Sequence, residues 1–178
     1  MKFIQSRFDQ WHTITGEDGP MVTLTPTPYS LLTHAQWNGV KHQWPADMPV
    51  GVVFPNDADI EDLADDLPRL ALVALQFPKW VDGRAYSQAR LLRSRFRFNG
   101  EVRAIGEVLV DMLPLLHRTG FSAVAMRADQ SIEVAEQVLR RFPGHYQGDT
   151  QEPRPLFARP VGEEYAGAED FVQAGASI

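Results

Sequence analysis

The chain has 178 residues, of which 44% are hydrophobic and 22% charged, a composition typical of one folded domain with a sizeable core. It contains no cysteine, which excludes disulfides, thiolate nucleophiles, and zinc or iron–sulfur sites that need sulfur ligands. Its net charge of -6 argues against general nucleic-acid binding, because such proteins neutralise phosphates with many lysines and arginines. We therefore expect a globular protein without nucleic-acid partners.

The sequence shows neither a secretory signal nor a membrane anchor. Charges and amides interrupt the first ten residues, and no stretch approaches the roughly 18 apolar residues that span a membrane. We expect a cytoplasmic protein that does not associate with membranes.

Residues 1–49 predict an irregular region of short strands and turns. Glycine and proline punctuate this segment, most visibly in GEDGP and TPTPY. The run MVTLT at 21–25 is its best candidate for a strand.

Residues 50–144 predict four consecutive strand–helix units. The apolar and β-branched runs expected to form strands lie at 50–54, 70–77, 101–106 and 121–126. Asp57 or Asp59 caps the first helix, which runs toward Leu67, and Asn99-Gly100 ends the second. Pro114 gives the third helix a late start or a kink, and the fourth follows Asp129 or Ser131.

Successive units of this kind pair their strands in parallel through right-handed crossovers and give a layered α/β sheet. A complete eight-unit barrel would need roughly 250 residues. A half-barrel and an open doubly wound sheet both remain possible, and we favour the open sheet. We treat residues 1–144 as a single α/β domain and predict an extended tail over 145–178, where proline, glycine and acids dominate.

The candidate site lies where loops leave the carboxyl ends of the strands, because ligands bind there in sheets of this type. Guanidinium and ammonium groups in these loops can hold an oxyanion, helped by the helix N-terminus near 84–87. The candidate anion-binding residues are Lys79, Arg84, Ser87 and Arg127. The residues expected to orient them are Asp82, Tyr86, Arg103 and Glu107. Alternatively, Asp82 only caps a helix, and Arg84 only forms an ion pair.

A second candidate surface follows from the arginines of the second helix. Arg90, Arg93 and Arg97 are spaced by three and four residues, which places them on one helical face. This stripe either docks an acidic partner or remains solvated.

The sequence predicts neither a metal site nor a cofactor. Residues 57–66 carry six acids and no base, which suits a hard cation but equally suits the first turn of a helix. The five histidines show no paired metal spacing. Neither a Gly-x-Gly-x-x-Gly motif nor a Walker A motif is present, so standard dinucleotide and P-loop fingerprints are missing.

The middle of the chain contains the motifs Phe77-Pro78-Lys79, Asp82-Gly83-Arg84, Tyr86-Ser87, Leu91-Leu92-Arg93 and Arg103-Ala104-x-Gly106. In these motifs it resembles a bacterial family catalogued as a domain of unknown function. The resemblance covers residues 50–143 well and the N-terminal third loosely. The chain departs from the family pattern at Glu107, Met112 and Thr119, where aspartate, glutamine and cysteine are expected.

The resemblance implies that the protein is encoded beside assimilatory sulfite reductase genes, as members of that family are. Such members are sometimes labelled oxidoreductases. The resemblance therefore implies an accessory protein of sulfite reduction that binds the reductase or its electron donor through Arg90, Arg93 and Arg97. The alternative is an enzyme or sensor that binds a small oxyanion or a phosphorylated metabolite through the carboxyl-end loops.

Overall fold

The computed structural model describes residues 1–14, 24–141 and 146–160. Within these residues, seven parallel strands form one sheet in the order β1-β7-β6-β5-β4-β3-β2. The strands are β1 (Lys2–Phe3), β2 (His12–Thr13), β3 (Ser30–Thr33), β4 (Val50–Phe54), β5 (Leu70–Phe77), β6 (Glu101–Gly106) and β7 (Ala123–Val124). The α-helices are α1 (His34–Val40), α2 (Arg84–Ser94), α3 (Leu113–Thr119) and α4 (Ile132–Arg141). Short 3-10 helices are η1 (Ser6–Phe8), η2 (Ile60–Leu63), η3 (Leu67–Arg69), η4 (Val110–Met112) and η5 (Leu156–Ala158).

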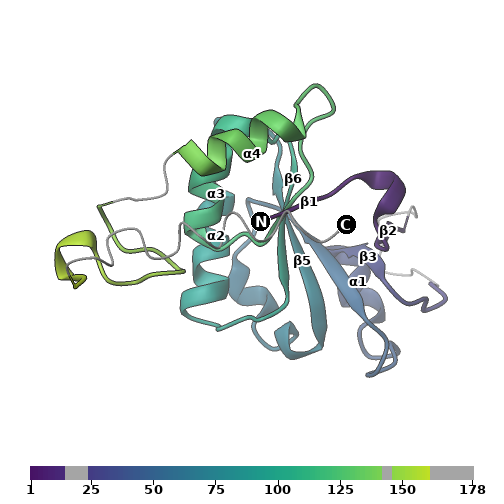
Figure 1. Cartoon of the computed structure of the whole chain (residues 1–178). Helices are drawn as coiled ribbons and strands as arrows, with labels where there is room; N and C mark the ends of the chain where they lie inside the picture. Colours follow the sequence, from purple (N-terminus) through teal and green to yellow (C-terminus); the bar gives the residue numbers. More distant parts are fainter. Residues whose placement is uncertain (15–23, 142–145, 161–178) are drawn as a thin grey trace.

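The sheet is curled into a half-barrel, and α2, α3 and α4 lie along one of its faces (Figure 1). Residues of all four α-helices belong to one continuous core with the strands, so the helices cover the same face. The expected parallel strand–helix architecture is therefore confirmed, in its half-barrel form. A doubly wound sheet, which needs helices on both faces, is not what the chain forms.

The main core takes alternate residues of the long strands. In β5, Val73, Leu75 and Phe77 face the helices, whereas Leu72 and Ala74 face the opposite side. All five side chains are fully buried, as expected for a strand covered on both faces.

The N-terminal segment covers the face of the sheet opposite the helices. β1 pairs with β7 at one edge and β2 pairs with β3 at the other, so residues 4–11 cross from edge to edge. Trp11 lies in this crossing segment, is 8% exposed, and packs on Leu31 and Val53. This segment therefore covers the second face of the sheet, which helices cover in a doubly wound fold.

Several element boundaries differ from the predictions. The segment after β4 forms the 3-10 helices η2 and η3 in place of one α-helix, with Asp59 accepting from the Glu61 amide at 3.0 Å. Helix α2 ends at Ser94, well before Asn99-Gly100, because Arg97 adopts a left-handed conformation with φ of 52°. β7 is two residues long, and α1 was not predicted.

Two predicted segments fall partly outside the described residues. Of the expected strand at 21–25, residues 21–23 lie outside, as do residues 145 and 161–178 of the expected tail. Residues 146–160 fold back on the domain: the Thr150 amide and hydroxyl both donate to the Arg118 carbonyl at the end of α3. Across the described parts of the chain, no helix has the length and hydrophobicity needed to cross a bilayer.

Candidate functional site

The loops that leave the carboxyl ends of β5, β6 and β7 are tied together through their backbones. The Glu107 amide donates to the Phe77 carbonyl at 2.8 Å, and the Arg127 amide donates to the Val108 carbonyl at 3.1 Å. The first contact depends on Gly106, whose φ is 97° and whose added Cβ would lie 2.4 Å from the Phe77 oxygen. The predicted gathering of loops at this edge therefore has a rigid backbone frame.

Arg84, at the start of α2, is held by its neighbour Asp82. Its Nε and Nη2 donate to the two carboxylate oxygens at 3.0 and 2.7 Å, and its backbone amide donates to Oδ1 at 3.2 Å. These contacts hold the pKa of the Asp82 carboxyl well below its usual range, chiefly through the hydrogen bond from the guanidinium. The charge of the Arg84 guanidinium is therefore neutralised by Asp82 of the preceding loop.

Arg127, after β7, is held by two carboxylates. It donates to Asp129 through Nε at 2.7 Å and Nη2 at 2.6 Å, and to Glu107 through Nη1 at 3.0 Å. The hydrogen bond from Arg127 lowers the pKa of Asp129 to about 2. The structure therefore brings Glu107 and Arg127 together as predicted, but in a cluster with more negative than positive charge.

Lys79 and Ser87 differ in environment from Tyr86. Lys79 and Ser87 are exposed, and the Lys79 side chain forms no ion pair within the described residues. Tyr86 is half-buried, and its ring packs against Phe77 and Phe121 at 5.2 and 6.4 Å between centroids. Burial raises the pKa of the Tyr86 phenol, consistent with a residue that completes the core.

Arg103 lies away from these loops. It sits in the middle of β6, alternating with core residues, and is 2% exposed on the face that the N-terminal segment covers. Its guanidinium pairs with Asp9 at 2.5 Å and with Glu101 at 2.6 Å. The contact with Asp9 joins β6 to the crossing segment, so Arg103 orients these two carboxylates and none of the residues at the carboxyl edge.

The three arginines predicted as a docking stripe do not share one helical face. Arg90 is exposed on α2, whereas Arg97 lies beyond the end of that helix. Arg93 is half-buried and donates to the backbone carbonyls of Phe98, Gly100 and Gly120. Burial lowers the pKa of the Arg93 guanidinium. Arg93 therefore joins α2 to the loops before β6 and β7.

Two features of this edge were not anticipated. Gln88, buried in α2, donates through Nε2 to the Pro55 carbonyl at 2.9 Å and to the Ala58 carbonyl at 3.0 Å, which fixes the loop after β4. Trp80 and Val81, at the tip of the loop after β5, are 57% and 65% exposed. In the sequence, the signal for this exposed tip was the position of the two apolar residues between the charged residues Lys79 and Asp82.

A histidine also follows β3 at this edge. His34 begins α1, its ring lies 4.8 Å from that of Phe54, and its Nε2 lies 3.0 Å from Nδ2 of Asn38. Burial lowers the pKa of the imidazole, so His34 is neutral near pH 7. Across the parts of the chain that the structure covers, no three potential metal-ligating side chains gather.

The chain matches a known protein family over more than half of its length. Residues 51–157, which run from β4 through every later strand to η5, match the family model described as a bacterial protein of unknown function, DUF934. The chain belongs to the DUF934 family. The resemblance inferred from the Phe77-Pro78-Lys79 and Asp82-Gly83-Arg84 motifs is therefore confirmed, and both motifs lie in the loop at the carboxyl edge. No curated protein matches this DUF934 chain.

Of the positions that depart from the expected DUF934 pattern, Glu107 keeps a carboxylate that pairs with Arg127. Met112 is 8% exposed in the core. The Thr119 hydroxyl donates to the Leu115 carbonyl within the last turn of α3 at 2.9 Å. Met112 and Thr119 thus have structural contacts of their own.

Proposed function

We propose that this DUF934 protein is an accessory protein of assimilatory sulfite reduction that associates with sulfite reductase or its electron donor. The metabolic context comes from the family resemblance, and the mode of action from the carboxyl edge. The observation that carries the proposal is the exposure of Trp80 and Val81, at 57% and 65%, on one loop tip. Large apolar side chains presented together to solvent mark interaction surfaces.

The loop that carries this pair is ordered before any partner binds. The Asp82 amide donates to the Lys79 carbonyl at 3.0 Å, which closes the tip into a turn. The Asp82–Arg84 ion pair fixes the loop end, and the helix that follows is fixed by Gln88. A pre-ordered apolar anchor loses little conformational entropy on binding, which favours affinity.

The charges near the tip indicate the chemistry of the partner. Lys79 and Arg90 are exposed and form no ion pair within the described residues. Lys79 is next to the apolar pair in the loop, and Arg90 lies on the exposed side of α2, the helix that follows; together they fit a partner surface that combines an apolar patch with carboxylates. We define the docking surface as Lys79, Trp80, Val81 and Arg90.

The oxyanion-binding alternative has less support from the geometry. Arg84 and Arg127 are each already paired with carboxylates, so an incoming anion would compete with intramolecular partners. The pKa values of the Asp82 and Asp129 carboxyls are lowered, which moves them away from neutral pH. General acid–base catalysis near neutral pH calls for the opposite shift.

The test is a binding measurement with purified sulfite reductase and with its purified electron donor. Replacing Trp80 and Val81 together by serine is expected to weaken binding to one of them at least about tenfold, because the anchor is lost. Phe8→Ser is the matched control, since Phe8 is an exposed aromatic in η1, outside the docking surface.

Charge is tested separately with Arg90→Glu, which is expected to weaken the same interaction and to reduce its dependence on salt. Arg141→Glu makes the same charge change at the end of α4 and is expected to leave binding unchanged. Absence of binding to both partners by the unmodified chain would contradict the proposal. So would equal affinity of the wild type and the Trp80/Val81 variant.

A further inference from the structure

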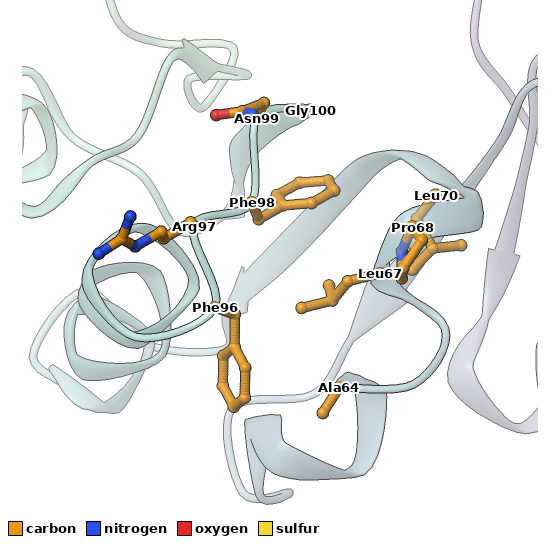
Figure 2. A pocket seen from close by; sticks show the side chains of 9 residues that line it. All are labelled: Ala64, Leu67, Pro68, Leu70, Phe96, Arg97, Phe98, Asn99 and Gly100. Atoms are coloured by element: carbon orange, nitrogen blue, oxygen red, sulfur yellow. The ribbon is translucent and has the colours of Figure 1, made fainter.

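A cavity of about 350 Å³ opens at the opposite end of the sheet, where β5 and β6 begin (Figure 2). Its wall combines Leu70, the first residue of β5, with the segment that precedes β6. The carboxyl-edge loops contribute no residue to this wall. The cavity is therefore separate from the docking surface.

The wall combines apolar side chains with polar groups from Arg97, Asn99 and the backbone. Leu67, Leu70 and Phe98 are buried, with exposed fractions of 5–6%. Ala64 and Phe96 are partly buried and lie across the opening from them in Figure 2. An apolar protein cavity of about 150 Å³ binds benzene, and ligand pockets begin at about 300 Å³. A cavity of this size and lining fits a bicyclic aromatic or a branched aliphatic group.

The end of α2 shapes the cavity. The Phe96 amide donates to the Leu91 carbonyl at 3.1 Å and the Phe98 amide to the Leu92 carbonyl at 2.8 Å, and Arg97 between them has φ of 52°. A left-handed arginine is strained, and strained backbone that is retained often belongs to a functional site. The ring of Phe98 packs closely against Gly100, where an added Cβ would lie 2.3 Å from the Phe98 Cζ.

The rim of the cavity carries a free cation. Arg97 is exposed and forms no ion pair or side-chain hydrogen bond within the described residues. Its side chain points outward from the rim in Figure 2, and the nearby Arg95 is neutralised by Glu61. Asn99, also exposed, adds an amide at the same opening. The Arg97 guanidinium points away from the cavity in Figure 2, and because this side chain is exposed, a change of rotamer can bring its charge to a ligand that emerges at the rim.

We propose that this cavity is a binding site for a small aromatic or branched aliphatic anion. The apolar body fills the space between Leu67, Phe96 and Phe98, and the anionic group lies at the rim beside Arg97. This site is separate from the docking function, because it shares no residue with the docking surface and lies at the opposite end of the sheet from Lys79, Trp80 and Val81.

The experiment uses 1-naphthoate as the probe and the neutral 1-naphthalenemethanol as its comparison. Titration of the ¹⁵N-labelled full chain, followed by amide chemical shifts, is expected to give saturable binding with shifts concentrated in residues 64–70 and 96–100. Shifts centred elsewhere, or no saturation, would overturn the proposal. This measurement needs no variant.

Two variants then separate the apolar and charged contributions. Ala64→Trp fills the partly exposed side of the cavity and is expected to weaken both probes at least about tenfold, while Val134→Trp on α4 leaves both unchanged. Arg97→Gln keeps the backbone conformation and is expected to weaken naphthoate about threefold without affecting the alcohol. Equal naphthoate affinity in the wild type and in Ala64→Trp would overturn the proposal.

Discussion

The interior of the domain and the carboxyl edge use arginine in opposite ways. Arg93 and Arg103 are withdrawn from solvent and join segments far apart in the sequence, through backbone carbonyls in one case and through Asp9 in the other. Arg84 and Arg127 remain on the surface and pair with carboxylates of their own or neighbouring loops. An arginine in a recognisable motif can therefore stabilise the fold as readily as it can form a binding site.

The largest effect on stability is expected at Arg103. Arg103→Met removes the cation that pairs with Asp9 and leaves Glu101 only its longer contact with Lys2, in a largely buried setting, which should lower the free energy of unfolding by about 3 kcal/mol. Urea denaturation measures this loss. Arg84→Met, the surface counterpart, should leave the midpoint unchanged. Equal losses in the two variants would remove the distinction between the regions.

A smaller loss is expected at Arg93, because carbonyl acceptors can recover some hydrogen bonding from water. Arg93→Met removes donors to Gly120 and Gly100, each at 2.9 Å, and should cost about 2 kcal/mol. Arg90→Met, three residues away on the exposed side of α2, is the matched control. If Arg93→Met is as stable as Arg90→Met, Arg93 does not join these segments.

Replacing Arg97 by glycine should stabilise the protein. Glycine adopts a φ of 52° without the strain that Cβ imposes, which is expected to raise the free energy of unfolding by about 1 kcal/mol. Arg95→Gly, at a right-handed position two residues earlier, should instead destabilise by about 0.5–1 kcal/mol. Thermal denaturation of both variants checks the sign, and a destabilised Arg97→Gly would refute the strain assigned there.

The smallest effect is expected from pH at the carboxyl edge. Because Arg127 lowers the pKa of Asp129 from 3.8 to about 2, the contribution of this pair to stability is fully present above pH 3.8 and is lost as pH falls through about 2. Carboxyl chemical shifts should show this low midpoint, and Arg127→Gln should return it toward 3.8. An Asp129 midpoint that does not respond to Arg127→Gln would contradict the assigned pairing.

The sequence predicted the centre of the fold well and its margins poorly. β4 and β5 are apolar runs bounded by proline, and β6 alternates apolar residues with Glu101 and Arg103 between two glycines; such patterns are strong local signals. Helix α1 has a weak composition and depends on the Thr33–Gln36 capping box and on burial of Trp37, which needs the folded sheet. Strand order and the crossing N-terminal segment likewise depend on pairings between distant residues.

The candidate site was predictable in position but not in electrostatics. The rule that ligands meet the carboxyl ends of strands identified the loop at 79–84. Which carboxylate each arginine binds depends on loop conformations, such as the turn that brings Asp82 back to Arg84. The end of α2 was missed because Phe98 enters the core, which requires the left-handed turn at Arg97.

We propose that the carboxyl edge, and not the opposite end of the sheet, contacts sulfite reductase or its electron donor. Amide hydrogen exchange of the full chain, alone and with each purified partner, distinguishes the two ends. We expect slowed exchange at residues 79–90 with one partner and unchanged exchange at 96–100. Protection at 96–100 with none at 79–90, or no protection with either partner, would contradict it.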